Sequence, residues 1–205
     1  MTGNKKTFFS ERREFLRKTF TTVPTAVAGY ALIHSTLSEA ASPSPAPVYQ
    51  PQFFTTAEWL FIHAAVARLI PNDELGVGAI EAGVPEFIDR QMEAPYGHGA
   101  LWYMQGPFVT TAAPEFGHQL KLVPREIYRL GIAAVNHWTQ TQHRAAFHEL
   151  SIDLQDELLQ QLEQGTITLA ELPSSLLFSQ LLQNTREGFF SDPQHGGNRG
   201  LAGWK

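Results

Sequence analysis

The chain has no cysteine among its 205 residues. It therefore carries no disulfide framework, no zinc–thiolate site and no cysteine-ligated iron–sulfur cluster, and it cannot attach c-type haem through a C-x-x-C-H motif. Basic residues are also outnumbered, since 15 Lys and Arg stand against 20 Asp and Glu and the formal net charge is −5. Phosphate contacts need a basic face, so the composition disfavours nucleic-acid binding.

Cofactor-binding motifs are missing as well. The nearest approach to a dinucleotide turn is Gly76-Val77-Gly78, but Glu81 stands where the third glycine belongs and no strand precedes it. There is no phosphate-binding P-loop and no G-x-S-x-G nucleophile motif. The sequence therefore predicts that this chain binds no cofactor of its own.

Histidines are the one group that suggests a metal. A helical zinc pair places two histidines four residues apart, whereas His143 and His148 are five apart and His137 and His143 six apart. Scattered structural histidines are the favoured interpretation, and an independent histidine- or metal-dependent enzyme stays as an alternative. The candidates are His63, His98, His118, His137, His143, His148 and His195.

Residues 1–40 differ from the rest, with six Lys or Arg against three acidic residues. A basic start and a mild apolar run from Phe20 to Leu37 follow the layout of an export signal. The paired arginines, followed by Glu14 and then Phe-Leu, resemble a twin-arginine (Tat) signal. The residues expected to be read by the export receptor are Arg12, Arg13, Phe15 and Leu16. The alternative is a basic amphipathic helix that stays on the protein.

The segment after this signal is rich in proline and serine. Ser38-Glu39-Ala40 offers a possible cleavage site, and residues 41–52 form an extended linker. The apolar run before it is too short and too polar for a stable membrane span. Residues 53–205 are then expected to form one folded domain.

The apolar period of the folded part is helical, so the predicted fold class is all-α, an irregular helical bundle with long loops. Thr55 and Glu58 have the form of a capping box, and Pro71 ends that helix. Trp59, Leu130, Ala134 and Trp138 are among the residues expected to face inward. The other helices are expected over 85–92, 124–143, 151–165 and 174–189.

Two stretches are expected to contact other proteins rather than to build the core. Residues 93–123 form a long aromatic loop, in which Trp102 and Tyr103 are candidate docking residues. The C-terminal tail combines glycines with Phe190, Arg199 and Trp204, which are residue types favoured at interfaces. The alternative for the tail is a loose chain end.

The order of several short motifs resembles the small subunit (subunit 3) of the gluconate 2-dehydrogenase family. After the twin arginines and the proline-rich linker come Phe54-Thr55-x-x-Glu58, Leu69-Ile70-Pro71, Ala82-Gly83-Val84-Pro85-x-Phe87-Ile88-Asp89, Gly106-Pro107-Phe108, the stretch from Phe147 to Gly165, Glu187-Gly188-Phe189-Phe190-Ser191-Asp192-Pro193, Gly196-Gly197-Asn198-Arg199 and Gly203-Trp204-Lys205.

The resemblance implies a non-catalytic subunit of a membrane-bound, periplasm-facing dehydrogenase. An FAD-containing catalytic subunit would oxidise a sugar or sugar acid such as gluconate, and a multihaem cytochrome c subunit would pass the electrons to quinone. The small subunit would help the flavoprotein mature and cross the membrane through the Tat translocase, and would meet the membrane only through its partners. A scaffold for an unrelated exported partner is the other alternative.

Overall fold

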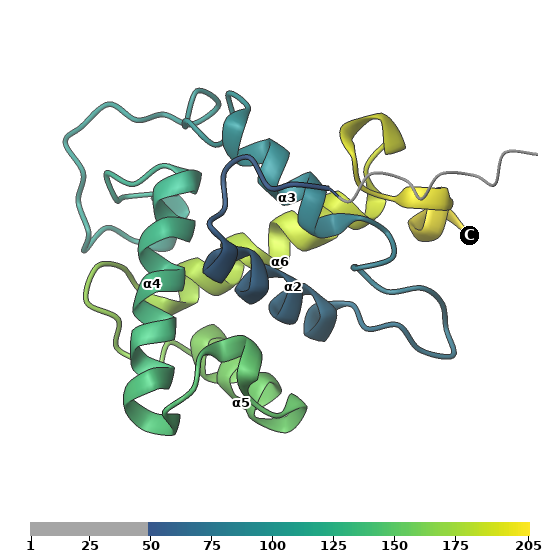
Figure 1. Cartoon of the computed structure of the whole chain (residues 1–205). Helices are drawn as coiled ribbons and strands as arrows, with labels where there is room; N and C mark the ends of the chain where they lie inside the picture. Colours follow the sequence, from purple (N-terminus) through teal and green to yellow (C-terminus); the bar gives the residue numbers. More distant parts are fainter. Residues whose placement is uncertain (1–48) are drawn as a thin grey trace, which may run out of the picture. The chain divides into compact units, whose positions relative to one another are not determined.

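The computed structural model describes residues 49–205, and Arg12, Arg13, Phe15 and Leu16 lie outside that range. Within it the fold is helical and contains no β-strand, as predicted (Figure 1). The α-helices are α2 (Thr56–Leu69), α3 (Val84–Glu93), α4 (Pro124–His143), α5 (Ile152–Glu163) and α6 (Ser174–Phe190). Short 3₁₀ helices are η1 (Pro114–Phe116), η2 (Phe147–Glu149), η3 (Pro193–His195) and η4 (Arg199–Trp204).

Helix ends follow the local signals in the sequence. The capping box at the start of α2 is formed, with the Thr55 amide donating to Glu58 Oε2 at 2.8 Å. Helix α4 begins at Pro124, and Ser151 caps α5 by accepting from the Leu154 amide at 3.4 Å. Predicted and observed helix ends agree within about two residues because caps and prolines act locally.

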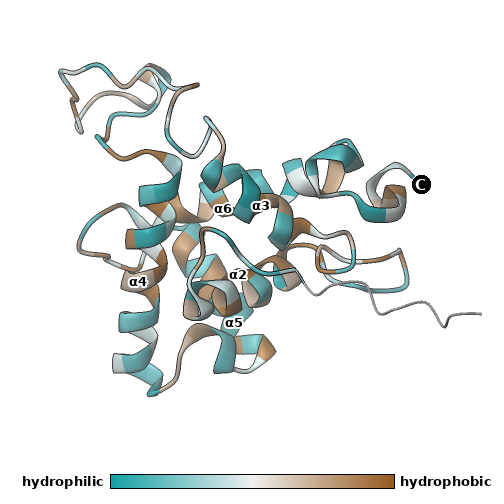
Figure 2. Ribbon diagram, turned by 45° about the horizontal axis from the view of Figure 1, so that its top comes forward, coloured by the Kyte–Doolittle hydropathy of each residue, from teal (hydrophilic) through white to brown (hydrophobic). Residues whose placement is uncertain are grey.

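Helix α6 is the centre of the packing, since it contacts all four of the other α-helices. Apolar residues gather where these helices meet (Figure 2). The approach of α4 to α6 depends on Gly131, where a Cβ atom would lie 2.6 Å from Leu177 Cδ1. The largest fully buried side chains include Phe61, Ile62, Ile88, Tyr128, Ile132, Phe147, Leu162, Leu177 and Leu181.

Some residues expected to face inward are only partly buried. Leu130, Ala134 and Trp138 on α4 line an open, mainly apolar groove of about 470 Å³ whose other wall is residues 168–171. Trp59 on α2 is also partly buried and packs against Tyr49 and His63. Helical periodicity identifies which face of a helix is apolar, but the tertiary arrangement decides how completely other elements cover this face.

Two irregular regions lie at opposite ends of the described domain in both ribbon views (Figures 1 and 2). One is the long loop between α3 and α4, and the other is the chain that follows α6. In residues 49–205 no helix is sufficiently long and apolar to span a bilayer.

Candidate docking site

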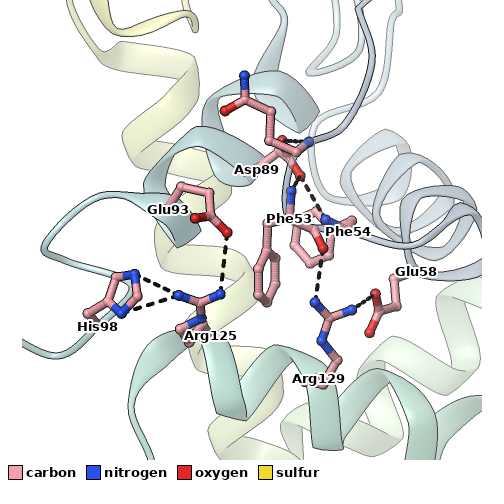
Figure 3. Close-up of polar contacts among 9 residues, drawn as sticks. Phe53, Phe54, Glu58, Asp89, Glu93, His98, Arg125 and Arg129 are labelled. Carbon is pink, nitrogen blue, oxygen red and sulfur yellow. Dashed lines mark hydrogen bonds and ion pairs between the residues drawn. The ribbon is translucent and has the colours of Figure 1, made fainter.

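The first described residues are fastened to the domain by one carboxylate (Figure 3). Asp89 on α3 is fully buried and accepts from the backbone amides of residues 52–54, at 2.7, 3.0 and 2.9 Å. The Tyr49 hydroxyl donates to it at 2.7 Å. Burial, together with this hydrogen bond, raises the pKa of Tyr49 to about 12. A buried carboxylate with four donors is satisfied, so Asp89 is a structural anchor.

Two arginines of α4 hold the same segment from the other side (Figure 3). The Phe53 ring lies 5.0 Å from the Arg125 guanidinium carbon and 4.2 Å from that of Arg129. Arg129 donates to the Phe53 carbonyl at 2.9 Å and pairs with Glu58, while Arg125 reaches Glu93 at 3.3 Å and also contacts His98. Both arginines are therefore paired with acceptors or aromatic rings. Their contacts hold the segment before α2 in place and do not form an open binding site.

The C-terminal tail is also fastened, by the buried side chain of Asn198. Its amide nitrogen donates to the Ser191 carbonyl at 2.9 Å, and its amide oxygen accepts from the Gly203 amide at 2.8 Å. Its backbone amide donates to the Gly188 carbonyl at 2.9 Å. Asn198 adopts φ 46°, a left-handed conformation that asparagine tolerates better than most residues. Asn198 thus ties two points of the tail to each other and to α6.

Glycines let the tail approach the helices closely. A Cβ atom at Gly197 would lie 2.1 Å from the Gly188 carbonyl oxygen, and one at Gly203 would lie 2.3 Å from the Phe189 carbonyl oxygen. Neither contact is possible for a real side chain, so backbone packs directly on backbone. The tail is therefore a folded element, not a loose end.

Large apolar side chains remain exposed on this folded tail. Phe190 is 55% exposed and Trp204 is 54% exposed, and Leu201, which lies between them in sequence, is 43% exposed. Trp204 is held in place, since its indole Nε1 donates to the Phe190 carbonyl at 3.0 Å. We call Phe190, Leu201 and Trp204 the tail face. Exposed apolar side chains on a fixed backbone are typical of protein–protein contacts.

Arg199 has a structural position beside the tail face. Its backbone amide donates to the Ala82 carbonyl at 2.9 Å, and its guanidinium pairs with Glu86 on α3. The side chain is still half exposed, so it fastens the tail to α3 and also lies at the surface. Its predicted role in docking stays a prediction.

The loop between α3 and α4, which carries Trp102 and Tyr103, lies at the other end of the domain from the chain that follows α6 (Figure 1). Trp102 is half-buried, with its ring 4.6 Å from the ring of His118 and 6.4 Å from that of Tyr96. Tyr103 is 80% exposed. The structure thus brings Phe190, Arg199 and Trp204 together and leaves Trp102 and Tyr103 in a second, separate region.

A groove of about 360 Å³ adjoins the tail face. It is lined by the end of α2 and the loop after it, including Leu69, Leu75 and Val77, and by the end of α6 and the tail, including Phe190 and Lys205. Leu75 was not foreseen as a contact residue, because a single leucine in a short polar loop carries no periodic signal. Asp89 and Asn198 were also missed, although helical spacing places Asp89 on the same face as Ile88 and Met92.

No set of three His, Cys, Asp or Glu side chains in residues 49–205 is arranged to hold a metal ion. His63 lies against the Trp59 ring at 4.6 Å, and burial lowers its pKa, partly opposed by Glu86. The Nε2 atom of His63 is buried without a hydrogen-bond partner. The histidine-based alternative thus gains no support from the described residues.

The comparisons with known proteins agree with the motif order. The family model described as gluconate 2-dehydrogenase subunit 3 matches residues 56–205, from the first turn of α2 through the tail face. Searches of curated proteins and of solved structures find no match to this chain.

Proposed function

This chain belongs to the gluconate 2-dehydrogenase subunit 3 family, and from that premise we propose that it is the non-catalytic small subunit of a membrane-bound, periplasm-facing dehydrogenase complex. The catalysed reaction is the oxidation of D-gluconate to 2-dehydro-D-gluconate. The observation that carries this proposal is the family match, which extends over α2 to α6 and includes the ordered tail.

The chemistry of the complex resides in other chains. FAD belongs to the catalytic subunit, and c-type haem belongs to a cytochrome subunit that passes electrons to quinone. This division fits a sequence that has neither a dinucleotide-binding turn nor a cysteine for haem attachment. The small subunit touches the membrane only through these partners.

The role of this chain is to bind the catalytic subunit and to take it across the membrane. The tail face supplies a contact surface whose backbone and Trp204 side chain are already held in place, which reduces the ordering entropy lost on binding. The twin arginines Arg12 and Arg13 supply a Tat signal for both proteins, so the assembled complex faces the periplasm.

A tagged pull-down from detergent-solubilised membranes tests the assembly. Capture of the full chain is expected to bring down an eluate with a flavin absorbance band and c-type haem peaks, together with gluconate-oxidising activity. A colourless eluate that contains this chain alone contradicts the proposal, and a flavin-free partner favours the scaffold alternative.

The export step is tested separately by Arg12→Lys with Arg13→Lys, which keeps the charge and removes the paired guanidinium groups. We expect both this chain and the flavoprotein to stay in the cytoplasm, as measured by fractionation and flavin absorbance. Arg17→Lys is the matched control and leaves export intact. Unchanged export of the double variant contradicts the Tat assignment.

A further inference from the structure

The loop after α2 ends in a closed turn that presents one leucine. The backbone amides of Asp73 and Gly76 each donate to the carbonyl of the other residue, at 3.1 and 3.2 Å. The Asp73 carboxylate accepts from the Leu75 amide at 2.8 Å, which forms an Asx turn. The turn is therefore fixed by three hydrogen bonds, although Asp73, Glu74 and Leu75 are all exposed.

Leu75 at the tip of this turn is 96% exposed, the highest exposure among the large apolar side chains that the structure describes. Its side chain contributes almost nothing to the core. If another surface covered this leucine, transfer of its apolar area out of water would contribute favourably to binding. Leu75 therefore projects from a fixed turn into solvent, as a side chain that inserts into a partner's pocket would.

Acidic residues are the sequence neighbours of Leu75, and Lys205 is the one basic residue among those that line the adjoining groove. Asp73 and Glu74 precede Leu75 directly and Glu81 follows, and residues 71–81 contain no lysine or arginine. Glu81 accepts from the Asn72 side chain at 3.2 Å, and no residue from 49 to 205 forms an ion pair with Asp73 or Glu74. A surface complementary to this turn therefore has an apolar socket and a basic rim.

Leu75 shares a groove with one residue of the tail face. Leu75 and Val77 line the 360 Å³ groove together with Ile70, Phe189 and Phe190. The turn and the tail come from opposite halves of the sequence but border one depression of mixed polarity. A single partner surface can therefore cover both.

We propose that Leu75 is a docking anchor that inserts into an apolar socket with a Lys/Arg rim on the catalytic subunit, and that Asp73 and Glu74 pair with that rim. This inference rests on the proposed function, since it names the surface through which the small subunit engages its partner. Two observations support this occupant: the acidic turn favours a partner surface with a basic rim, and the groove shared with Phe190 lets one surface cover both the turn and the end of α6.

The test measures binding of the purified full chain to the purified catalytic subunit. Leu75→Ala is expected to weaken the affinity roughly ten- to hundredfold, as loss of one buried leucine contact implies. Its melting temperature is expected to equal that of the wild type, because Leu75 is outside the core. The matched control is Ile152→Ala at the start of α5, which removes a side chain that is 58% exposed and leaves the affinity unchanged.

The charge component is tested by Asp73→Asn with Glu74→Gln. The asparagine oxygen can still accept from the Leu75 amide, so the turn is retained while two negative charges are removed. We expect a slower association rate at low salt and a weaker dependence of affinity on ionic strength than in the wild type.

Each outcome has a distinct meaning. If Leu75→Ala binds the catalytic subunit as tightly as Ile152→Ala, the docking role of Leu75 is refuted while the proposed function stands. If the wild-type chain itself does not bind the catalytic subunit, the proposed function fails and the docking role of Leu75 fails with it. If Leu75→Ala instead abolishes self-association of this chain, the occupant is a second copy and the inference is overturned.

Discussion

The C-terminal tail and the long loop between α3 and α4 both expose aromatic side chains, but they are held in different ways. The tail is tied by the buried Asn198 and by glycine contacts with α6. Beyond Trp102, the loop is tied mainly to itself, for example through Gln119, which accepts from the Val109 amide and donates to the Phe116 carbonyl. The two regions are therefore alike in exposure but differ in order, and a fixed framework loses less conformational entropy when another protein binds to it.

The largest effect is expected from Gly197→Ala. A Cβ atom there would lie 2.1 Å from the Gly188 carbonyl oxygen, and backbone cannot move aside as a flexible side chain can. We expect the free energy of unfolding to fall by about 3 kcal/mol or more, or the tail to detach and lose partner binding. Chemical denaturation and limited proteolysis of the tail measure the two outcomes.

Two other glycines serve as controls, one in each region. Gly200 in the tail (φ 68°) and Gly117 in the loop (φ 74°) have no heavy atom within 4 Å of an added Cβ. Alanine at either position adds only the strain of a left-handed conformation, ~1 kcal/mol. If Gly197→Ala is no more destabilising than these two variants, the tail is not packed as described.

A smaller difference in stability is expected when one amide side chain is removed from each region. Asn198→Gly keeps the left-handed backbone and removes two side-chain hydrogen bonds from a buried site, so we expect a loss of about 2–3 kcal/mol. Gln119→Ala removes two bonds from the more exposed loop and is expected to cost less than about 0.5 kcal/mol. If thermal denaturation shows equal losses of unfolding free energy for the two variants, the tail is not held more firmly than the loop.

The smallest effect concerns pH and His63, which lies near the Glu86–Arg199 pair that fastens the tail. Because burial lowers its pKa, the folded state binds fewer protons than the unfolded state once the pH falls below about 6.5. Its contribution to stability therefore decreases on acidification from neutral pH. Phenylalanine and glutamine do not titrate. We therefore expect the melting temperatures of His63→Phe and His63→Gln to fall less on acidification than that of the wild type. An unchanged pH profile in both variants would contradict it.

The sequence predicted the helices well because their signals are local. Thr55, Pro124 and Ser151 act within one turn of their own helices, and each begins or caps a helix as expected. The tail was recognised as unusual from its glycines and aromatics. The reason for the glycines, close contact with Gly188 and Phe189 of α6, required the tertiary arrangement.

The features that sequence reasoning missed depend on distant contacts or on none at all. Asp89 anchors residues that are about 35 positions earlier in the chain, and no local pattern shows such a partner. Leu75 is notable because residues 49–205 leave it 96% exposed, and absence of contact has no sequence signature. Trp102 was recognised as a surface aromatic, yet packing against His118 and Tyr96 covers part of it.

The Asp89 anchor has a mechanical consequence. The chain before α2 is attached to α3 through a carboxylate that grips Tyr49 and residues 52–54. Tension applied upstream of Tyr49 is therefore passed into α3 through Asp89 and into α4 through Arg129, and not along the backbone into α2 alone. The start of α2 thus carries only part of the load when the chain before it is pulled.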